Sequence, residues 1–125
     1  MNLNQVTLPA SNIDESASFY ERMGFKKIVS DTHYVRFECP GGDSTFSLEK
    51  TDELPGPSCA VIYFEVDDLN SVFVSLIEKG FVFESGPTDE EWLWSEAKLK
   101  DPTGNTICIY TAGENRKYPP WRINA

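Results

Sequence analysis

The sequence predicts an α+β fold made of two tandem βαβββ modules. One observation is a repeated pair of helix boundaries. Asn12-Ile13 and Asp68-Leu69 each begin a helix-like segment, and Gly24-Phe25 and Gly80-Phe81 each end one. Corresponding boundaries are 56 positions apart. A second observation is that short segments of alternating polarity flank both helices, which is typical of half-buried strands.

A third observation is a repeated turn. Pro40-Gly41-Gly42 and Pro102-Thr103-Gly104 are 62 positions apart, so the second copy carries about six additional residues, which we expect in a loop at residues 85–91. The 125 residues are the size of one domain. We divide this domain into module one (3–50), a linker (51–58), module two (59–111) and a C-terminal tail (112–125).

Each module is expected to run strand, helix and three further strands. In module one we expect strands at 4–10, 26–30, 33–38 and 44–49 and a helix at 13–23. In module two we expect strands at 60–66, 81–84, 92–100 and 106–110 and a helix at 69–79. Asn12 and Asp68 are suited to cap the helix N-termini, and Gly24 and Gly80 to end the helices in a left-handed conformation.

Side chains alternate between the two faces of a strand, so each predicted strand has one apolar and one polar face. The apolar faces are expected to pack under the helices. The other faces combine aromatic, charged and hydrogen-bonding side chains, as small-molecule cavities do. We predict that the ligand-binding residues are Gln5, Thr7, Tyr34, Arg36, Ser47, Glu49, Tyr63, Trp92, Trp94, Glu96, Lys98 and Cys108. The alternative is a sheet face that is simply turned to solvent.

Charge and hydropathy exclude several classes of partner. The chain has 11 Lys and Arg against 20 Asp and Glu, a net charge of −9, which disfavours nucleic acid and anionic membranes. No apolar run approaches the length of a membrane span, and the N-terminus has no signal-peptide pattern, so we expect a cytoplasmic protein. Three cysteines, an odd number, predict reduced thiols rather than a disulfide framework.

Several motifs resemble those of the vicinal oxygen chelate superfamily, which includes glyoxalase I, bleomycin-resistance proteins and extradiol dioxygenases. The opening segment Gln5–Ile13, with Phe19-Tyr20 and Gly24-Phe25, resembles the start of its first module. Phe64–Leu69 resembles the start of the second module, and Asp101–Asn105 resembles the closing turn. Together the motifs cover residues 3 to 111. The resemblance implies paired βαβββ modules whose eight strands form a curved, mostly antiparallel sheet around a shared cleft.

Enzymes of this superfamily hold a divalent metal through His and Glu side chains. In this chain the corresponding positions are Gln5, Ser47, Val61 and Cys108. None of these is a usual ligand for such a metal, so we predict a member without a metal cofactor. An alternative is a divalent metal at a non-standard site near Glu49, Glu65 and Glu96, in a lyase, isomerase or dioxygenase.

The favoured interpretation is a metal-free small-molecule-binding protein whose ligand is aromatic or cationic. Trp92 and Trp94 form either a stacking wall or a hydrophobic plug at an interface. Arg36 and Lys98 occupy matched positions and pair either with an anionic ligand or with glutamates of the chain. We expect a homodimer, with the aromatic tail packed on the domain or on the partner subunit.

Overall fold

The computed structural model describes residues 1–53 and 60–123. Its elements divide into two compact units, which are treated separately below. The first comprises residues 1–53 together with Asp101–Asn105, and the second comprises residues 60–100 and 106–123. The linker predicted at 51–58 falls largely outside the described residues.

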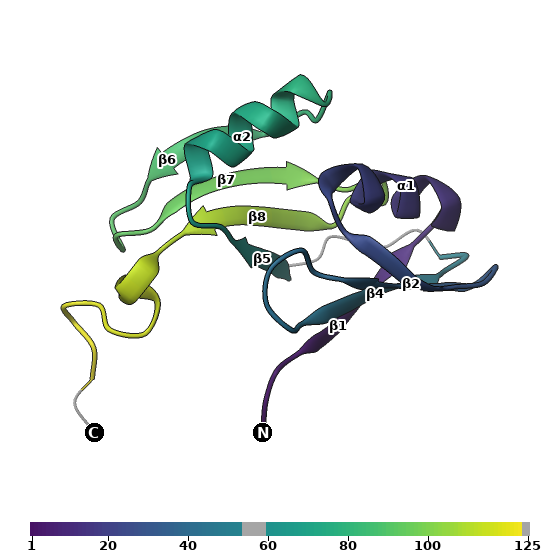
Figure 1. The fold of residues 1–125 in the computed structure, drawn as a ribbon, viewed down its shortest axis with the longest axis horizontal. Coiled ribbons are helices and arrows are strands. Elements are labelled where there is room, and N and C mark those ends of the chain that lie inside the picture. The colour runs from purple at the N-terminus through teal and green to yellow at the C-terminus, as the bar shows by residue number, and fades with distance from the viewer. Residues whose placement is uncertain (54–59, 124–125) are drawn as a thin grey trace. The chain divides into compact units, whose positions relative to one another are not determined.

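The first unit is a four-stranded sheet covered on one face by a helix (Figure 1). Its elements are β1 (Gln5–Ala10), α1 (Ile13–Met23), β2 (Lys26–Ser30), β3 (Tyr34–Glu38) and β4 (Thr45–Lys50). The strand order is β1-β4-β3-β2. β1 pairs with β4 in parallel, and the other two pairs are antiparallel.

Local signals at both ends account for α1. The Asn12 side chain accepts a hydrogen bond from the Glu15 amide at 3.0 Å, and Gly24 ends the helix at a φ of 116°. Tyr20 on this helix packs against Phe25 and Phe46, with ring centroids 5.8 and 4.6 Å apart. These rings form the core between the helix and the sheet.

The second unit repeats the arrangement. Its elements are β5 (Val61–Glu65), α2 (Leu69–Glu78), β6 (Ser85–Asp89), β7 (Ser95–Lys100), β8 (Thr106–Thr111) and the 3-10 helix η1 (Gly113–Arg116). The strand order is β5-β8-β7-β6, with β5 parallel to β8. Asp68 caps α2 by accepting from the Ser71 amide at 3.1 Å. The predicted α+β fold of two βαβββ modules is confirmed, and the eight strands are divided between two four-stranded sheets.

One predicted strand was wrong. Residues 81–84 do not form a strand, and the segment assigned to a loop, 85–91, contains β6. β6 is an edge strand whose register with β7 shifts between Ser85 and Thr88. Gly86 and Pro87 lie at this irregularity, where a proline is tolerated because its missing N–H leaves no ladder bond broken.

Trp92 lies in a turn and not in a strand, because β7 begins only at Ser95. Leu93 in this turn has a φ of 66°, a left-handed conformation that is uncommon for a residue with a side chain. The turn is closed by a 2.8 Å hydrogen bond from the Glu90 amide to the Trp94 carbonyl.

The turn Asp101–Asn105, between β7 and β8 in the chain, belongs to the first unit. Asp101 Oδ1 accepts the backbone N–H groups of Thr103, Gly104 and Asn105 at 2.8–3.0 Å. Asp101 Oδ2 accepts from the buried Tyr20 hydroxyl at 2.7 Å, and Asn105 Nδ2 donates to the Pro9 carbonyl. The motif that resembles the superfamily's closing turn is therefore a hydrogen-bonded anchor on α1 and β1.

The tail begins with η1 and continues to residue 123. Tyr118, Trp121 and Ile123 are exposed, so their side chains do not pack on the domain as one of the two expectations had it. Their burial against a partner subunit stays a prediction. Neither helix of the described chain is long and apolar enough to cross a membrane.

Candidate functional site: the helix-free faces of the two sheets

The predicted ligand-binding residues lie on the faces of the two sheets that point away from α1 and α2, here called the helix-free faces. Strand register confirms the alternation from which they were derived, since Ser47 pairs with Thr7 and Arg36, and Cys108 pairs with Tyr63 and Lys98. The first helix-free face carries Gln5, Thr7, Tyr34, Arg36, Ser47 and Glu49. The second carries Tyr63, Trp94, Glu96, Lys98 and Cys108, and Trp92 reaches it from the preceding turn.

On the first helix-free face, four predicted residues form one hydrogen-bonded chain. Gln5 Nε2 donates to Ser47 Oγ at 2.8 Å, Ser47 Oγ lies 2.5 Å from the Tyr34 hydroxyl, and Arg36 Nε donates to that hydroxyl at 3.0 Å. Ser47 is fully buried at the centre of this chain. Thr7 and Glu49 lie on the same face, are exposed, and make no side-chain hydrogen bond or ion pair within the described residues.

The matched cations Arg36 and Lys98 differ in their partners. Lys98 Nζ lies 3.7 Å from Glu96 Oε1. No carboxylate of residues 1–53 or 60–123 lies within 4 Å of the Arg36 guanidinium, whose hydrogen bond and cation–π contact are both with Tyr34. The difference arises two residues earlier in each strand, where β7 has a glutamate and β3 has a tyrosine. The prediction of an internal ion pair thus holds for Lys98 and fails for Arg36.

The second helix-free face is an aromatic surface. Trp94 stacks on Tyr110 with ring centroids 4.8 Å apart and an interplanar angle of 22°. Tyr63 meets both rings edge-on, at 5.9 and 5.5 Å. Trp94 Nε1 donates to the Asn115 carbonyl at 3.1 Å, which fixes the indole, while Tyr63 remains 44% exposed. The cluster is therefore fixed in orientation and open on the Tyr63 side.

Glu96 is the buried charge beside this aromatic surface, with 3% of the residue exposed. One oxygen accepts the Trp92 indole N–H at 2.7 Å. The other oxygen has weaker partners, since Lys98 Nζ and Cys108 Sγ both lie 3.7 Å away. A buried carboxylate with one weakly bound oxygen is well placed to accept a further N–H donor.

Burial, with Glu96 beside it, keeps the Cys108 thiol protonated. Burial, and next the Glu96 carboxylate with its hydrogen bond, raise the pKa of the Cys108 thiol to about 12. Burial and the Glu96 charge similarly raise the pKa of the Tyr63 hydroxyl. Both groups are therefore neutral near pH 7, and Cys108 is not an activated nucleophile.

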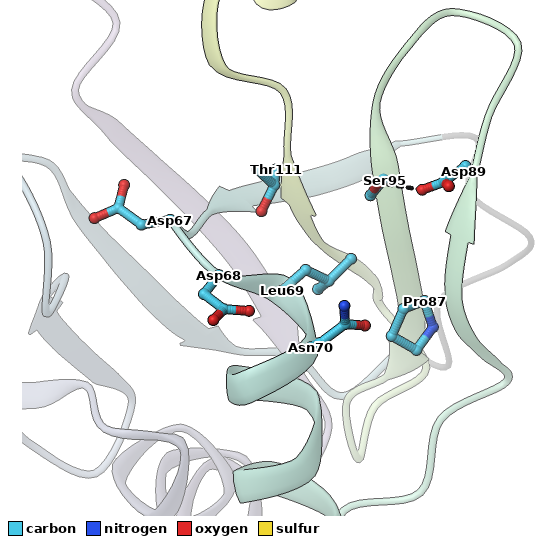
Figure 2. Close-up of a pocket in the computed structure, with 8 residues that line it drawn as sticks. All are labelled: Asp67, Asp68, Leu69, Asn70, Pro87, Asp89, Ser95 and Thr111. Carbon is cyan, nitrogen blue, oxygen red and sulfur yellow. Dashed lines mark hydrogen bonds between the residues drawn. The ribbon is translucent and has the colours of Figure 1, made fainter.

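A separate hollow of about 480 Å³ opens in the second unit beside the start of α2 (Figure 2). Its wall contains Asp67, Asp68, Asn70 and Asp89, with Ser95 donating to Asp89. None of the predicted ligand-binding residues lines it. Its lining is mostly polar and acidic, with Leu69 and Pro87 as its apolar residues, whereas small-molecule pockets are lined mainly by apolar and aromatic side chains.

Comparison with known proteins agrees with the fold and with the motifs. Residues 2–109 match the family model of the Glyoxalase/Bleomycin resistance protein/Dioxygenase superfamily. The chain belongs to this superfamily. Among sequences, this superfamily member is 28% identical over 110 residues to an uncharacterized protein of Mycolicibacterium smegmatis, covering 87% of this chain and 92% of that protein.

Solved structures share the fold of this superfamily member. A bleomycin-binding protein complexed with bleomycin is 24% identical with a TM-score of 0.74, over 89% of this chain and 98% of that one. A lactoylglutathione lyase from Agrobacterium tumefaciens is 16% identical with a TM-score of 0.73, over 88% of this chain and 92% of that one. At these identities the likeness shows the fold alone.

The residues at the superfamily's metal-ligand positions do not fit a divalent ion. Gln5 and Ser47 are bonded to each other, Val61 has no donor atom, and Cys108 holds its proton to about pH 12. Within the part of the chain that the structure describes, no three His, Cys, Asp or Glu side chains are grouped to hold a metal. Of the glutamates of the non-standard site considered from the sequence, Glu65 is paired with Arg116, and Glu96 with Lys98 and Trp92.

Two contributors to these faces were not among the predicted residues. Tyr110 forms the second ring of the aromatic stack, and Thr45 donates to Gln5 Oε1. Both have the strand parity of the predicted residues, so alternation was a sufficient signal for them. Asn115 contributes through its backbone carbonyl, for which the sequence carries no signal.

Proposed function

We propose that this superfamily member is a small-molecule-binding protein that works without a metal and binds a planar aromatic or cationic ligand on its second helix-free face. The observation that carries the proposal is the aromatic surface of Tyr63, Trp94 and Tyr110 beside the buried Glu96 carboxylate. Flat, rigid rings provide contact area for the ligand at a low cost in side-chain entropy, and the fixed carboxylate orients the ligand.

Cation binding is favoured by two features. A positive group above the rings gains from their negative faces, and Glu96 supplies a full negative charge that is shielded from water. The net charge of −9 adds a long-range attraction for cations. Lys98 opposes these terms, because its ammonium already lies 3.7 Å from Glu96 and a ligand must displace it.

Binding is favoured over metal-dependent catalysis by the donor set described above. A metal acts as a Lewis acid only where several donors converge on it, and Gln5, Ser47, Val61 and Cys108 do not provide them. Metal analysis of protein purified without chelators tests this point. Stoichiometric nickel, zinc, iron or manganese would favour the lyase, isomerase or dioxygenase alternative.

Calorimetric titration tests the ligand class, with bleomycin and the planar cation proflavine as probes. Replacing Tyr63 by Ala removes the open side of the wall and should weaken binding about 3- to 10-fold, the worth of one stacking or cation–π contact. Glu96→Gln keeps an acceptor for Trp92, removes the charge, and should weaken binding by a similar factor. Val74→Ala, at an exposed position on α2 of the same unit, is the matched control. The proposal is contradicted if neither probe binds detectably. It is also contradicted if the control substitution weakens binding as much as Tyr63→Ala and Glu96→Gln do.

We propose further that the protein acts in the cytoplasm as a homodimer, without nucleic-acid or membrane partners. Exposed Tyr118, Trp121 and Ile123 support a partner subunit, since large apolar side chains gain from burial. Sedimentation at micromolar concentration distinguishes a dimer from a 14.1 kDa monomer.

A further inference from the structure

The first helix-free face holds a cation without a counter-ion. Arg36 is half-buried in β3, and its Nε is bound to the Tyr34 hydroxyl. In residues 1–53 and 60–123, no carboxylate or hydrogen-bond acceptor is placed at its two terminal amino groups. The planar guanidinium therefore keeps two parallel N–H donors for an incoming group, the geometry that carboxylates and phosphates accept.

Proton positions along the adjoining chain follow from its acceptors. Thr45 donates to Gln5 Oε1, so the amide nitrogen of Gln5 faces Ser47 and donates to its oxygen. Ser47 Oγ and the Tyr34 hydroxyl oxygen lie 2.5 Å apart, and either can donate in the hydrogen bond between them.

The Tyr34 oxygen receives a second hydrogen bond from Arg36 Nε at 3.0 Å. When Ser47 is the donor to Tyr34, the phenol oxygen accepts from both Ser47 and Arg36, and its own proton is left for an incoming acceptor. In that arrangement each link of the chain donates in the same sense, and the last donor is Tyr34.

We propose that Tyr34 and Arg36 form an oxyanion-binding site, which takes a ligand carboxylate or phosphate through the Tyr34 hydroxyl and the free edge of the Arg36 guanidinium. Gln5 and Ser47, which occupy metal-ligand positions of the superfamily, act as positioning residues that orient the Tyr34 proton. The site takes an anion, so it goes beyond the proposed function, whose cationic or aromatic ligand lies on the other sheet.

Glu38, which pairs with Thr45, and Glu49, which pairs with Tyr34, are the other charged residues of β3 and β4 on this face. The pairing of Glu49 with Tyr34 brings Glu49 near the site. Its carboxylate is exposed and more than 4 Å from the guanidinium, so it does not occupy the anion position. It does repel an arriving anion, a modest effect for an exposed charge. Glu49→Gln should therefore strengthen anion binding about two-fold.

Nuclear magnetic resonance titration of the full chain tests the proposal, with benzoate as carboxylate and phenyl phosphate as phosphate. Benzyl alcohol is the neutral comparison. We expect either anion to shift the Arg36 Nε–H resonance and the backbone amide resonances of β3, which the Arg36 variants retain, with saturation at millimolar concentration, and benzyl alcohol to leave both unchanged. Arg36→Met should weaken anion binding at least about 10-fold, whereas Arg36→Lys, which keeps the charge and loses the fork, should retain part of it. Tyr34→Phe should weaken it about 3- to 10-fold.

Lys26→Met, which removes an exposed cation from β2 of the same sheet, is the matched control and should change affinity less than two-fold. Equal effects of Lys26→Met and Arg36→Met, saturation by benzyl alcohol, or no shift with either anion would overturn the proposal. Loss of bleomycin and proflavine binding with anion binding intact would refute the proposed function and leave this site standing.

Discussion

Replacing Tyr20 by Phe should lower the free energy of unfolding by about 1.5–3 kcal/mol, the worth of a hydrogen bond to a charged group. The Tyr20 hydroxyl is buried and donates to Asp101 Oδ2 at 2.7 Å. Phenylalanine keeps the ring that packs on Phe25 and Phe46, so no large cavity forms. Asp101 Oδ2 still accepts from Asn105 Nδ2 at 2.7 Å, which keeps the effect below that of an orphaned buried charge.

Urea unfolding at pH 7 measures this difference, and the slope against urea should not change. The melting temperature should fall by roughly 6–12 °C for a chain of this size. Tyr118→Phe is the matched control, because this exposed hydroxyl makes no side-chain hydrogen bond in the described residues. A loss below about 0.5 kcal/mol for Tyr20→Phe, equal to the control, would refute the anchoring role of the Asp101–Asn105 turn.

The same pair has a defined alkaline behaviour. Burial, and then the Asp101 carboxylate, raise the pKa of Tyr20 above its usual value. The folded state therefore favours the neutral phenol, and this contribution is complete below about pH 10, the ordinary tyrosine pKa. Above that pH the unfolded chain ionises first, so the stability difference between the wild type and Tyr20→Phe should narrow.

Three further changes have expected outcomes. The folded thiol of Cys108 stays neutral to about pH 12. Between pH 8 and 10 the wild type should therefore lose about 1.5 kcal/mol more stability than Cys108→Ala, measured by urea unfolding. Parallel pH curves of the two proteins would contradict the assigned burial of the thiol. Leu93→Gly should stabilise the chain by about 0.5–1 kcal/mol, because φ is 66° there, and a lower melting temperature would show that the Leu93 side chain has a packing role. Deleting residues 118–125 leaves the Trp94–Asn115 and Arg116–Glu65 contacts intact and removes the exposed tail aromatics. Sedimentation velocity should then report a dimer converted to a monomer, and an unchanged sedimentation coefficient would rule out the tail as the interface.

The sequence was sufficient to predict the repeated βαβββ module and the sheet face on which most of the site residues lie. Period-two alternation placed Gln5, Ser47 and Cys108 on helix-free faces, because a buried apolar face fixes the register of a strand. Caps at Asn12 and Asp68 likewise located both helix starts. These signals are local, and each depends on residues within one turn or one strand.

The features that the sequence did not predict depend on an adjacent strand or on another residue of the same sheet face. β6 has the composition Ser-Gly-Pro-Thr-Asp, which has little strand propensity, and it forms because β7 offers a free edge. The partners of Arg36 and Lys98 could not be assigned from their matched positions either. Their difference is set by the residue two positions earlier on the same face, Tyr34 in one module and Glu96 in the other.

Whether Arg36 stays free to bind an anion because Tyr34 replaces a carboxylate can be tested directly. Tyr34→Glu places a carboxylate at the position in β3 that matches Glu96 in β7, so an internal ion pair with Arg36 should form. Tyr34→Gln has the same size without the charge. Both variants lose the phenol proton, and only the glutamate occupies the guanidinium, so Tyr34→Glu should bind benzoate at least about 5-fold more weakly than Tyr34→Gln. Benzoate affinity is measured by the shift of the Arg36 resonance. Equal affinities of the two variants would show that the missing carboxylate is not the reason why Arg36, unlike Lys98, is free to bind an anion.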